Sequence, residues 1–384
     1  MDLSSVRIKE HFGIVTNDTN TAKFTFLISP PKNRESIQKQ DIICLDHPIY
    51  GDTCQILGEV TEITSYEEVA GSTIRDRIGK LLAATRIIGY IDLRGENKPL
   101  QKLLIPPNPG SRVYLPYSAF LQDVLNRGTD GRPYVQPLFL GKTEIAAATQ
   151  ETNDQQLSYY LNSDLLCKHT LICGVDGAGK THTATVILEE LAGKITQPIV
   201  VFDPNNEYAT LGTASKALET IPVAADLQKN SPEVAAKKIK PNQVTIINAE
   251  SLLMSQKNDY YSNVLKALTK GKQEKTSQTF LVIVEDADNL ATQALQEVLA
   301  CKEVGAILIS SHPTLLGGKI LSQIQTVIIG KTVDQQDLAY LNNMTGGVEE
   351  ELPLLNLGEW VIAGLNIARP TKIQIRERYS ARAT

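Results

Sequence analysis

The hydrophobic positions divide the chain into two parts with different patterns. Up to about residue 148, short stretches rich in β-branched residues alternate with turn signals such as Gly51-Asp52 and the proline-rich segment 105–111. These stretches are residues 23–29, 41–46, 52–63 and 86–93. Strands that are this short and this closely spaced predict a small β-barrel, with one helix near residues 117–126.

After about residue 149, near-continuous apolar runs alternate with helical patterns. Strands that helices cover on both faces are apolar throughout, so these runs predict a parallel sheet. They lie at residues 169–174, 198–203, 243–248, 279–286, 305–310 and 326–331, with a helix at 181–194 and a terminal β-hairpin at 358–377. We therefore expect an α/β protein with a barrel domain at 1–148, an α/β domain at 149–377 and a tail at 378–384. The polar residues 150–156 are the expected linker.

The overall composition is that of an ordinary globular protein. Hydrophobic residues make up 42% and charged residues 21% of 384 residues, and the net charge is −5. No global basic field indicates nucleic acid, although a channel can be locally basic inside an acidic protein. The five cysteines form no CxxC motif, which favours reduced thiols. Without a signal peptide or a run of about 18 apolar residues, we expect a cytoplasmic protein with no membrane partner.

The segment after the strand at 169–174 has the spacing of a phosphate-binding loop. Its sequence GVDGAGKT fits G-x-x-x-x-G-K-[ST] between a strand and a helix. Glycines let backbone N–H groups point at phosphate oxygens, and the helix N-terminus adds positive potential. Lys180 is expected to reach the β- and γ-phosphates of ATP, and the Thr181 hydroxyl to bind Mg²⁺. The predicted nucleotide-binding residues are Gly174, Val175, Asp176, Gly177, Ala178, Gly179, Lys180, Thr181 and His182.

Acidic residues end the apolar run at 279–286, on what we expect to be a neighbouring strand. One carboxylate of Glu285 and Asp286 would hold the Mg²⁺ shell, and the other would orient or deprotonate the attacking water. The next strand ends in Ser310 and Ser311, where a side chain can meet the γ-phosphate. His312 is either a second sensor of that phosphate or a solvated loop histidine.

The strand at 198–203 ends in the segment FDPNNEY, with Asp203 and Glu207. Either these two acids serve the nucleotide site or the segment forms a plain Asx-type turn.

Several segments in order resemble the HerA branch of the FtsK–HerA motor ATPases. KHTLICGVDGAGKTHT resembles the Walker A segment, VFDPNNEY the D-P-H-G-E-Y motif and LVIVEDADNL the Walker B strand. GAILISSHPTLLGGKILSQIQTVIIGKTVDQQD is similar to the stretch that usually reads V-S-Q-R-P-S and then L-S-Q, with Ser322, Gln323 and either Asp334 or Asp337 matching it. LGEWVIAG with 368–370 resembles the closing hairpin. The likeness covers residues 165–377, and the N-terminal half resembles the family's small barrel.

This resemblance implies a RecA-like P-loop NTPase core that uses ATP and Mg²⁺. It also implies a hexameric ring with nucleotide at the subunit interfaces, which translocates along double-stranded DNA. Family members often work with a NurA-like nuclease that docks through the barrel, in DNA end processing or defence.

The chain departs from the family at several charged positions. Glu285-Asp286 replaces the usual order Asp-Glu, which shortens the base by about one methylene if Asp286 is the base. His312, Lys168, Lys331 and Lys302 stand where the family usually has arginine or another basic residue. Because only a guanidinium forks across two oxygens, hydrolysis is expected to be slow, lost, or served in trans by another arginine such as Arg369. The predicted catalytic residues are Lys180, Glu285, Asp286, Ser311, His312 and Lys168, and the predicted metal ligands are Thr181, Glu285 and Asp286.

Three functions stay open at this stage. The first is an ATP-driven DNA translocase or helicase, and the second is a catalytically weakened ring subunit that scaffolds or regulates a nuclease or effector. The third is a protein-remodelling ATPase. The basic segments 237–243 and 270–275 are either channel loops for DNA or solvated turns.

Overall fold

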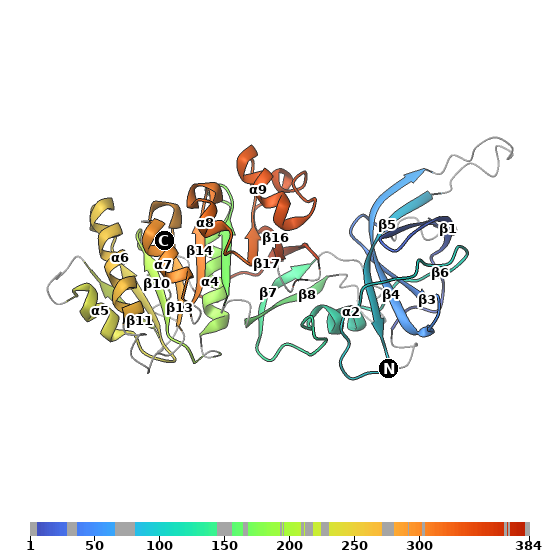
Figure 1. Ribbon diagram of the computed structural model, residues 1–384, viewed down its shortest axis with the longest axis horizontal. Helices are drawn as coiled ribbons and strands as arrows, with labels where there is room; N and C mark the ends of the chain where they lie inside the picture. The colour runs from blue at the N-terminus through green and yellow to red at the C-terminus, as the bar shows by residue number, and fades with distance from the viewer. Residues whose placement is uncertain are drawn as a thin grey trace. The chain divides into compact units, whose positions relative to one another are not determined.

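A computed structural model of the protein describes most of the chain in two compact units (Figure 1). The units are Met1–Tyr134 with Lys142–Tyr159, and Val135–Gly141 with Tyr160–Thr384. The predicted boundary at residue 148 and most of the predicted linker lie outside the described residues, as do Lys302 and residues 271–275. Described are residues 6–28, 37–65, 81–143, 156–163, 168–192, 194, 196–208, 211, 218–223, 230–270, 280–290, 292–301, 304–364, 367 and 369–380.

The first unit is the predicted barrel. Its sheet has the order β3-β4-β5-β2-β1-β6, and Tyr114, which follows β6, bridges Cys44 in β3 and so brings the two ends together. Alternate residues such as Phe24, Phe26 and Ile56 point inward and are fully buried. The elements are β1 (Gly13–Thr19), β2 (Lys23–Ile28), β3 (Ile42–His47), β4 (Gly51–Ser65), β5 (Leu81–Asp92), β6 (Arg112–Val113) and α2 (Ser118–Leu125).

The other sheet contains eleven strands in the order β11-β12-β10-β13-β14-β9-β15-β16-β17-β7-β8. All neighbours from β11 to β15 are parallel, whereas β16 and β17 form the predicted antiparallel hairpin. The strands are β7 (Pro137–Thr143), β8 (Leu157–Asn162), β9 (His169–Cys173), β10 (Ile199–Asp203), β11 (Leu218–Pro222), β12 (Val244–Asn248), β13 (Phe280–Val284), β14 (Val304–Ser310), β15 (Thr326–Ile329), β16 (Glu359–Gly364) and β17 (Thr371–Ile375).

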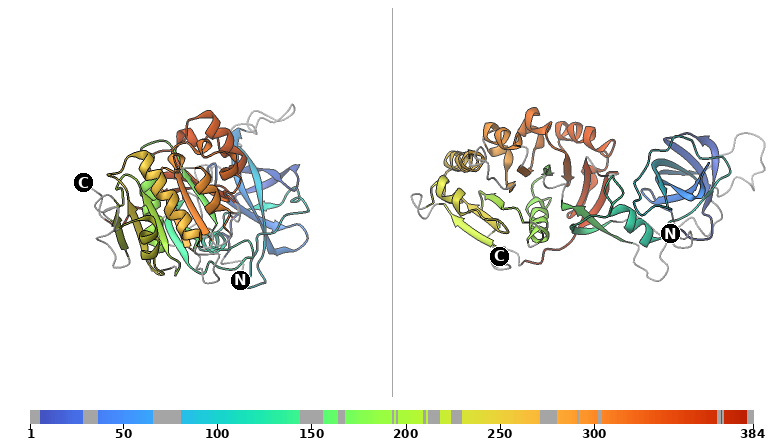
Figure 2. Two further views of the ribbon diagram at one scale, coloured as in Figure 1. Left: turned by 60° about the vertical axis from the view of Figure 1, so that its left-hand side comes forward. Right: turned by 60° about the horizontal axis from the view of Figure 1, so that its bottom comes forward.

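Helices cover both faces of the parallel part, as the apolar runs predict. Residues of α6, α7 and α8 share one core cluster with Val282 and Leu308 of the sheet, while α4 lies on the opposite face (Figure 2). The helices are α4 (Lys180–Leu191), α5 (Pro232–Lys238), α6 (Met254–Lys270), α7 (Thr292–Leu299), α8 (Gly318–Leu321) and α9 (Gln335–Thr345). Short 3-10 turns are η4 (Ala287–Asn289), η5 (Pro313–Leu316) and η6 (Leu352–Leu354). None of the helices in the described part is long and apolar enough to cross a membrane.

One sequence expectation about the sheet is wrong. The acidic strand β13 is not the direct neighbour of the loop-bearing strand β9, because β14 pairs with both and lies between them. Chain order does not fix which of several buried apolar strands pair. Since the three strands are parallel, their carboxyl ends still meet at one edge of the sheet, where ligands of open α/β sheets bind.

Candidate nucleotide-binding site

The loop between β9 and α4 depends on its glycines. Gly177 and Gly179 have φ of 81° and 97°, in the left-handed region that other residues rarely adopt. A Cβ on Gly174 would lie 3.2 Å from the main-chain oxygen of Lys331. The Val175 N–H donates to that same oxygen at 2.8 Å, which anchors the loop against the end of β15. The chain thus forms the curled turn that GVDGAGKT predicts.

Lys180 lies under this loop with its ammonium group surrounded by oxygens. Its Nζ donates to the carbonyl oxygens of Gly174 and Val175 at 3.1 and 3.3 Å and reaches Asp176 Oδ1 at 3.2 Å. Ser311 Oγ, at the end of β14, lies 2.9 Å away. Lys180 is 8% exposed, and a buried cation needs such partners. The structure therefore brings Lys180 and Ser311 together, as the sequence predicts for a γ-phosphate site.

Glu285 joins the loop from the end of β13. Its Oε1 lies 3.1 Å from the hydroxyl of Thr181, and its Oε2 accepts a hydrogen bond from the hydroxyl of Tyr208. Burial is the main cause that raises the pKa of Glu285 to about 8, and nearby Glu207 and Asp286 add to it. The Thr181 hydroxyl also contacts Glu207. The Thr181 hydroxyl thus lies between the carboxylates of Glu207 and Glu285.

Asp286 diverges from Glu285. Its backbone is left-handed with φ of 48°, which is uncommon for a residue with a Cβ and typical of functional sites. Its Oδ2 accepts a hydrogen bond from Asn205 Nδ2 at 2.9 Å. The two acids thus occupy different environments, with Glu285 beside Thr181 and Asp286 at the more open side of the site.

Residues 203–208 contribute more than the sequence analysis assigned to them. The Asp203 carboxylate accepts from the main-chain N–H of Asn205, two residues on, as in an Asx-type turn. It also accepts from the N–H groups of Glu207 and Tyr208 at 2.9 and 3.1 Å. The same turn delivers Asn205 to Asp286, Glu207 to Thr181 and Tyr208 to Glu285. The segment FDPNNEY thus forms a turn and also brings three side chains to the predicted nucleotide site. The position of the segment directly after a parallel strand was the signal for this role.

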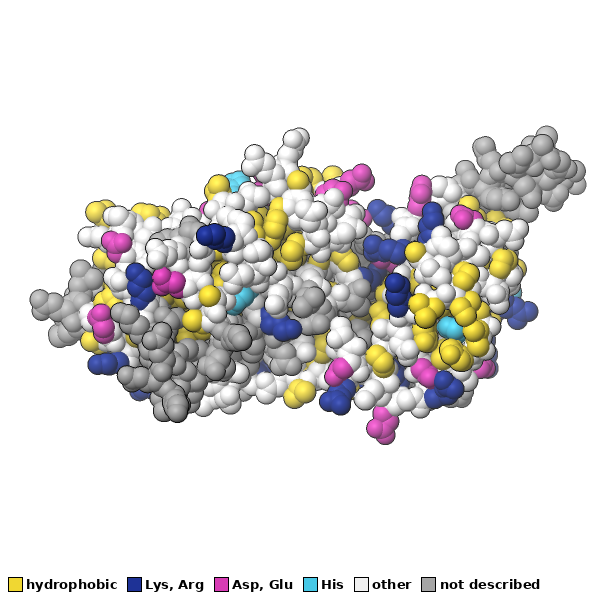
Figure 3. Space-filling model, in the orientation of Figure 1, with side chains coloured by type: hydrophobic (Ala, Val, Ile, Leu, Met, Phe, Trp, Pro, Cys, Tyr) yellow, Lys and Arg dark blue, Asp and Glu magenta, His cyan; other side chains and the backbone are white. Residues whose placement is uncertain are grey.

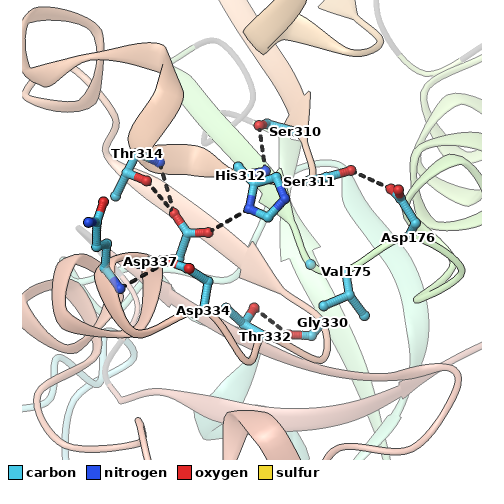
Figure 4. A network of polar contacts seen from close by, with 12 residues as sticks. Val175, Asp176, Ser310, Ser311, His312, Thr314, Gly330, Thr332, Asp334 and Asp337 are labelled. Carbon is cyan, nitrogen blue, oxygen red and sulfur yellow. Dashed lines mark hydrogen bonds and ion pairs between the residues drawn. The ribbon is translucent and has the colours of Figure 1, made fainter.

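His312 is held by a second acid. Its Nδ1 lies 3.1 Å from Asp337 Oδ2, and its main-chain N–H donates to Ser310 Oγ at 3.1 Å (Figure 4). Asp337 is 1% exposed and also accepts from the N–H and hydroxyl of Thr314, at 3.0 and 2.6 Å. The His312 ring is 54% exposed but has Asp337 as a partner, so it is not a freely solvated loop residue. Of the two acids proposed for this motif, Asp337 joins the network, whereas Asp334 caps α9.

Three other predicted residues lie away from the loop. Lys168 precedes β9, at the end opposite to the loop; five strand residues separate the two by roughly 17 Å. Lys168 therefore cannot serve the site of its own chain. The His182 ring contacts the main-chain oxygen of Arg376, the residue after β17, at 3.0 Å. Arg369 is 7% exposed, which argues against its presentation to another subunit.

The donor set fits a nucleotide and its Mg²⁺. The described residues include no group of three or more His, Cys, Asp and Glu side chains that could hold a metal ion by themselves. Mg²⁺ rarely has such a cage, because it keeps several waters and binds one or two protein oxygens together with substrate phosphates. Thr181 and Glu285 supply such oxygens next to the phosphate-binding loop.

Comparison with known proteins agrees with this site. Residues 146–304 match the family model described as the central domain of helicase HerA. This segment is therefore similar to the central domain of HerA-type ATPases. A DNA double-strand break repair helicase HerA of Sulfurisphaera tokodaii is 30% identical over 160 residues, which are 36% of this chain and 32% of the relative.

Two further proteins are similar. A probable helicase of Methanocaldococcus jannaschii is 24% identical over 224 residues, 52% of this chain and 38% of the relative. The chain thus spans about a third of the length of these two helicases. A genome packaging NTPase of Sulfolobus turreted icosahedral virus 2 has a TM-score of 0.40 and 17% identity, over 56% of this chain and 99% of the solved one.

Proposed function

We propose that the protein is an ATP-driven motor that moves along double-stranded DNA. The observation that carries this proposal is the meeting of Lys180, Thr181, Ser311 and Glu285 from three parallel strands at one sheet edge. The HerA-type domain supports DNA as the track, because a related protein is named a DNA repair helicase. With a net charge of −5 the chain has no overall basic field, so a DNA contact would have to be local. On the face in Figure 3, Lys and Arg side chains lie among acidic and apolar ones.

Each residue of the proposed active site has a task that follows from its position. Loop N–H groups and Lys180 bind the phosphates, and Ser311 meets the terminal one. Thr181 and Glu285 hold Mg²⁺, which when bound neutralises phosphate charge. Asp286 lies at the open side and orients or deprotonates the attacking water. Asn205 and Tyr208 act on Asp286 and Glu285 as positioning residues.

The assembly is a further part of the proposal. We propose a homohexamer with nucleotide at subunit interfaces, working with a NurA-like nuclease in the cytoplasm. The domain limits 1–148, 149–377 and 378–384 belong to the same proposal. Lys168 is too distant from the loop to act in its own chain. It could act only at the nucleotide site of a neighbouring subunit, and a ring places such a subunit beside it.

A steady-state ATPase assay with and without duplex DNA tests the motor. We expect DNA to stimulate phosphate release, and Lys180→Ala to abolish both nucleotide binding and turnover because the phosphates lose their cation. Asp286→Asn should bind ATP normally and lose turnover about 100-fold or more, as expected for removal of a general base.

A specific observation favours a second candidate function, the weakened ring subunit. Asp286 is one methylene shorter than glutamate and is already bonded to Asn205, and His312 replaces an arginine. Tight ATP binding by the wild type without phosphate release, with DNA present, would support that function and exclude the motor.

A further inference from the structure

Asp176 is the third residue of the phosphate-binding loop. Its carboxylate lies where a phosphate of the nucleotide is expected to bind. Its Oδ1 accepts hydrogen bonds from Lys180 Nζ at 3.2 Å and from Ser311 Oγ at 2.5 Å. Figure 4 shows the contact with Ser311, which joins the loop after β9 to the end of β14. These two donors are the groups assigned above to the terminal phosphates. The Asp176 carboxylate thus accepts the hydrogen bonds that Lys180 and Ser311 would otherwise donate to a phosphate.

The donors of Lys180 are all in use. An ammonium group has three N–H bonds, and Nζ has the oxygens of Gly174, Val175, Asp176 and Ser311 around it. The two carbonyl oxygens belong to the folded loop. A phosphate oxygen can therefore accept a hydrogen bond from Lys180 most easily by displacing the carboxylate of Asp176.

Asp176 can be displaced, whereas Lys180 is held in place. The side chain of Asp176 is 93% exposed and that of Lys180 is 9% exposed. Hydrogen bonds from Ser311 and Lys180 hold the pKa of Asp176 below its ordinary value, so the group carries its negative charge at neutral pH. A bound triphosphate would meet this charge as well as the competition for donors.

We propose that Asp176 competes with the terminal phosphate of the nucleotide for Lys180 and Ser311, and so limits ATP affinity and narrows the preference for ATP over ADP. The proposal rests on the proposed function of this site. ATP must displace the carboxylate from both donors, whereas ADP, without a γ-phosphate, leaves the contact with Ser311 intact. Asp176 is thus a specificity-determining residue that acts within the chain as a substitute for phosphate.

Nucleotide binding by Asp176→Asn tests the proposal. Trp360, the only tryptophan of the chain, is fully buried against Gly330 and close to Gly179, so its fluorescence is a probe of the loop. Dissociation constants are measured for a slowly hydrolysed ATP analogue and for ADP, each with Mg²⁺. The control is Asp18→Asn, which removes the same charge from an exposed position in the barrel.

We expect Asp176→Asn to bind the ATP analogue roughly fivefold more tightly, the size of a solvent-screened ion pair, and ADP less than twofold more tightly. Asp18→Asn should bind both nucleotides like the wild type. Equal affinity of Asp176→Asn and wild type for the ATP analogue would overturn the inference, as would an equal gain for ADP. Failure of both proteins to bind either nucleotide would instead overturn the proposed function, and this inference with it.

Discussion

At the scale of single residues, three side chains of the site differ from the usual HerA motifs. Asn206 stands where D-P-H-G-E-Y has glycine, and its φ of 63° is a left-handed conformation that asparagine tolerates better than most residues. Asn205 stands at the histidine of the motif and donates to Asp286, the shortened acid. Asn205 and Asp286, which both differ from the usual motifs, are thus the two partners of one hydrogen bond.

Asn205→Ala is expected to lower kcat for ATP roughly threefold to tenfold with little change in KM. Removing one hydrogen bond costs about 0.5–1.5 kcal/mol, and this bond orients the proposed base and not the bound phosphates. Steady-state ATPase kinetics measure both constants. Asn206→Gly is the matched control, because glycine retains the left-handed conformation, and it should keep kcat near that of the wild type. An unchanged kcat in Asn205→Ala would show that Asp286 is oriented by other means or is not the base.

At the scale of elements, the phosphate-binding helix α4 is fixed from its far side. Arg376, directly after β17, pairs with Glu189 and Glu190 of α4 at 2.9 and 3.0 Å. The N–H groups of Tyr379 and Ser380 donate to Glu189, so the first residues of the predicted tail pack on this helix. The His182 ring adds its contact with the oxygen of Arg376. The hairpin thus anchors the helix whose N-terminus faces the proposed nucleotide site.

Arg376→Ala is expected to destabilise the α/β unit by about 2–4 kcal/mol, because Glu189 loses its cation and Glu190 keeps only its pair with Lys194 at 2.7 Å. Thermal unfolding at neutral pH should show a lower midpoint. Arg132→Ala is a suitable control, since that side chain is 73% exposed and its ion pair contributes little. An unchanged midpoint in Arg376→Ala would contradict the anchoring role.

The same destabilisation should depend on pH. Burial raises the pKa values of Glu189 and Glu190, but hydrogen bonds outweigh it and leave both below the ordinary value of 4.5. Carboxylates with lowered pKa values stabilise the fold above pH 4.5 and lose this contribution as the pH falls through the folded-state values. The difference between wild type and Arg376→Ala should therefore shrink below about pH 4.5.

At the scale of the whole molecule, the parallel sheet has two edges with different roles. The carboxyl ends of β9, β13 and β14 carry the nucleotide site, whereas Lys168 and the basic segment 237–243 precede β9 and β12 at the opposite edge. Lys237 and Lys238 lie in the last turn of α5, where cations stabilise the helix dipole, and Lys238 donates to Asn230 Oδ1 at 2.8 Å. These contacts favour the solvated-turn interpretation of the segment.

The double variant Lys237→Glu/Lys240→Glu is expected to bind duplex DNA within about twofold of the wild type. If the two lysines instead neutralised DNA phosphates, the variant would bind with a weaker salt dependence, and the slope would change by about 0.9 for each phosphate. Titrations at several salt concentrations measure both the affinity and the slope. A large loss of affinity together with a shallower slope would assign this segment to the DNA channel.

The sequence determined the fold class and half of the site. Apolar runs and turn signals act locally, so they predicted the barrel strands β2 to β5, the hairpin and every parallel strand except β11. The strands β1, β6, β7, β8 and β11 were missed, and no bounds were predicted for helices α5 to α9. Lys180, Thr181 and the acidic pair were recognisable because their spacing along one strand, loop and helix is itself the chemical requirement.

Only the tertiary structure decided which distant residues share an oxygen or a proton. That β14 separates β9 from β13 follows from strand pairing, which many apolar strands could satisfy in other orders. The contacts of Asp176 with Ser311 and of Thr181 with Glu207 join segments 135 and 26 residues apart. A hydrogen bond requires its two atoms to lie within about 3 Å, and for segments so far apart in the sequence that distance is set by folding.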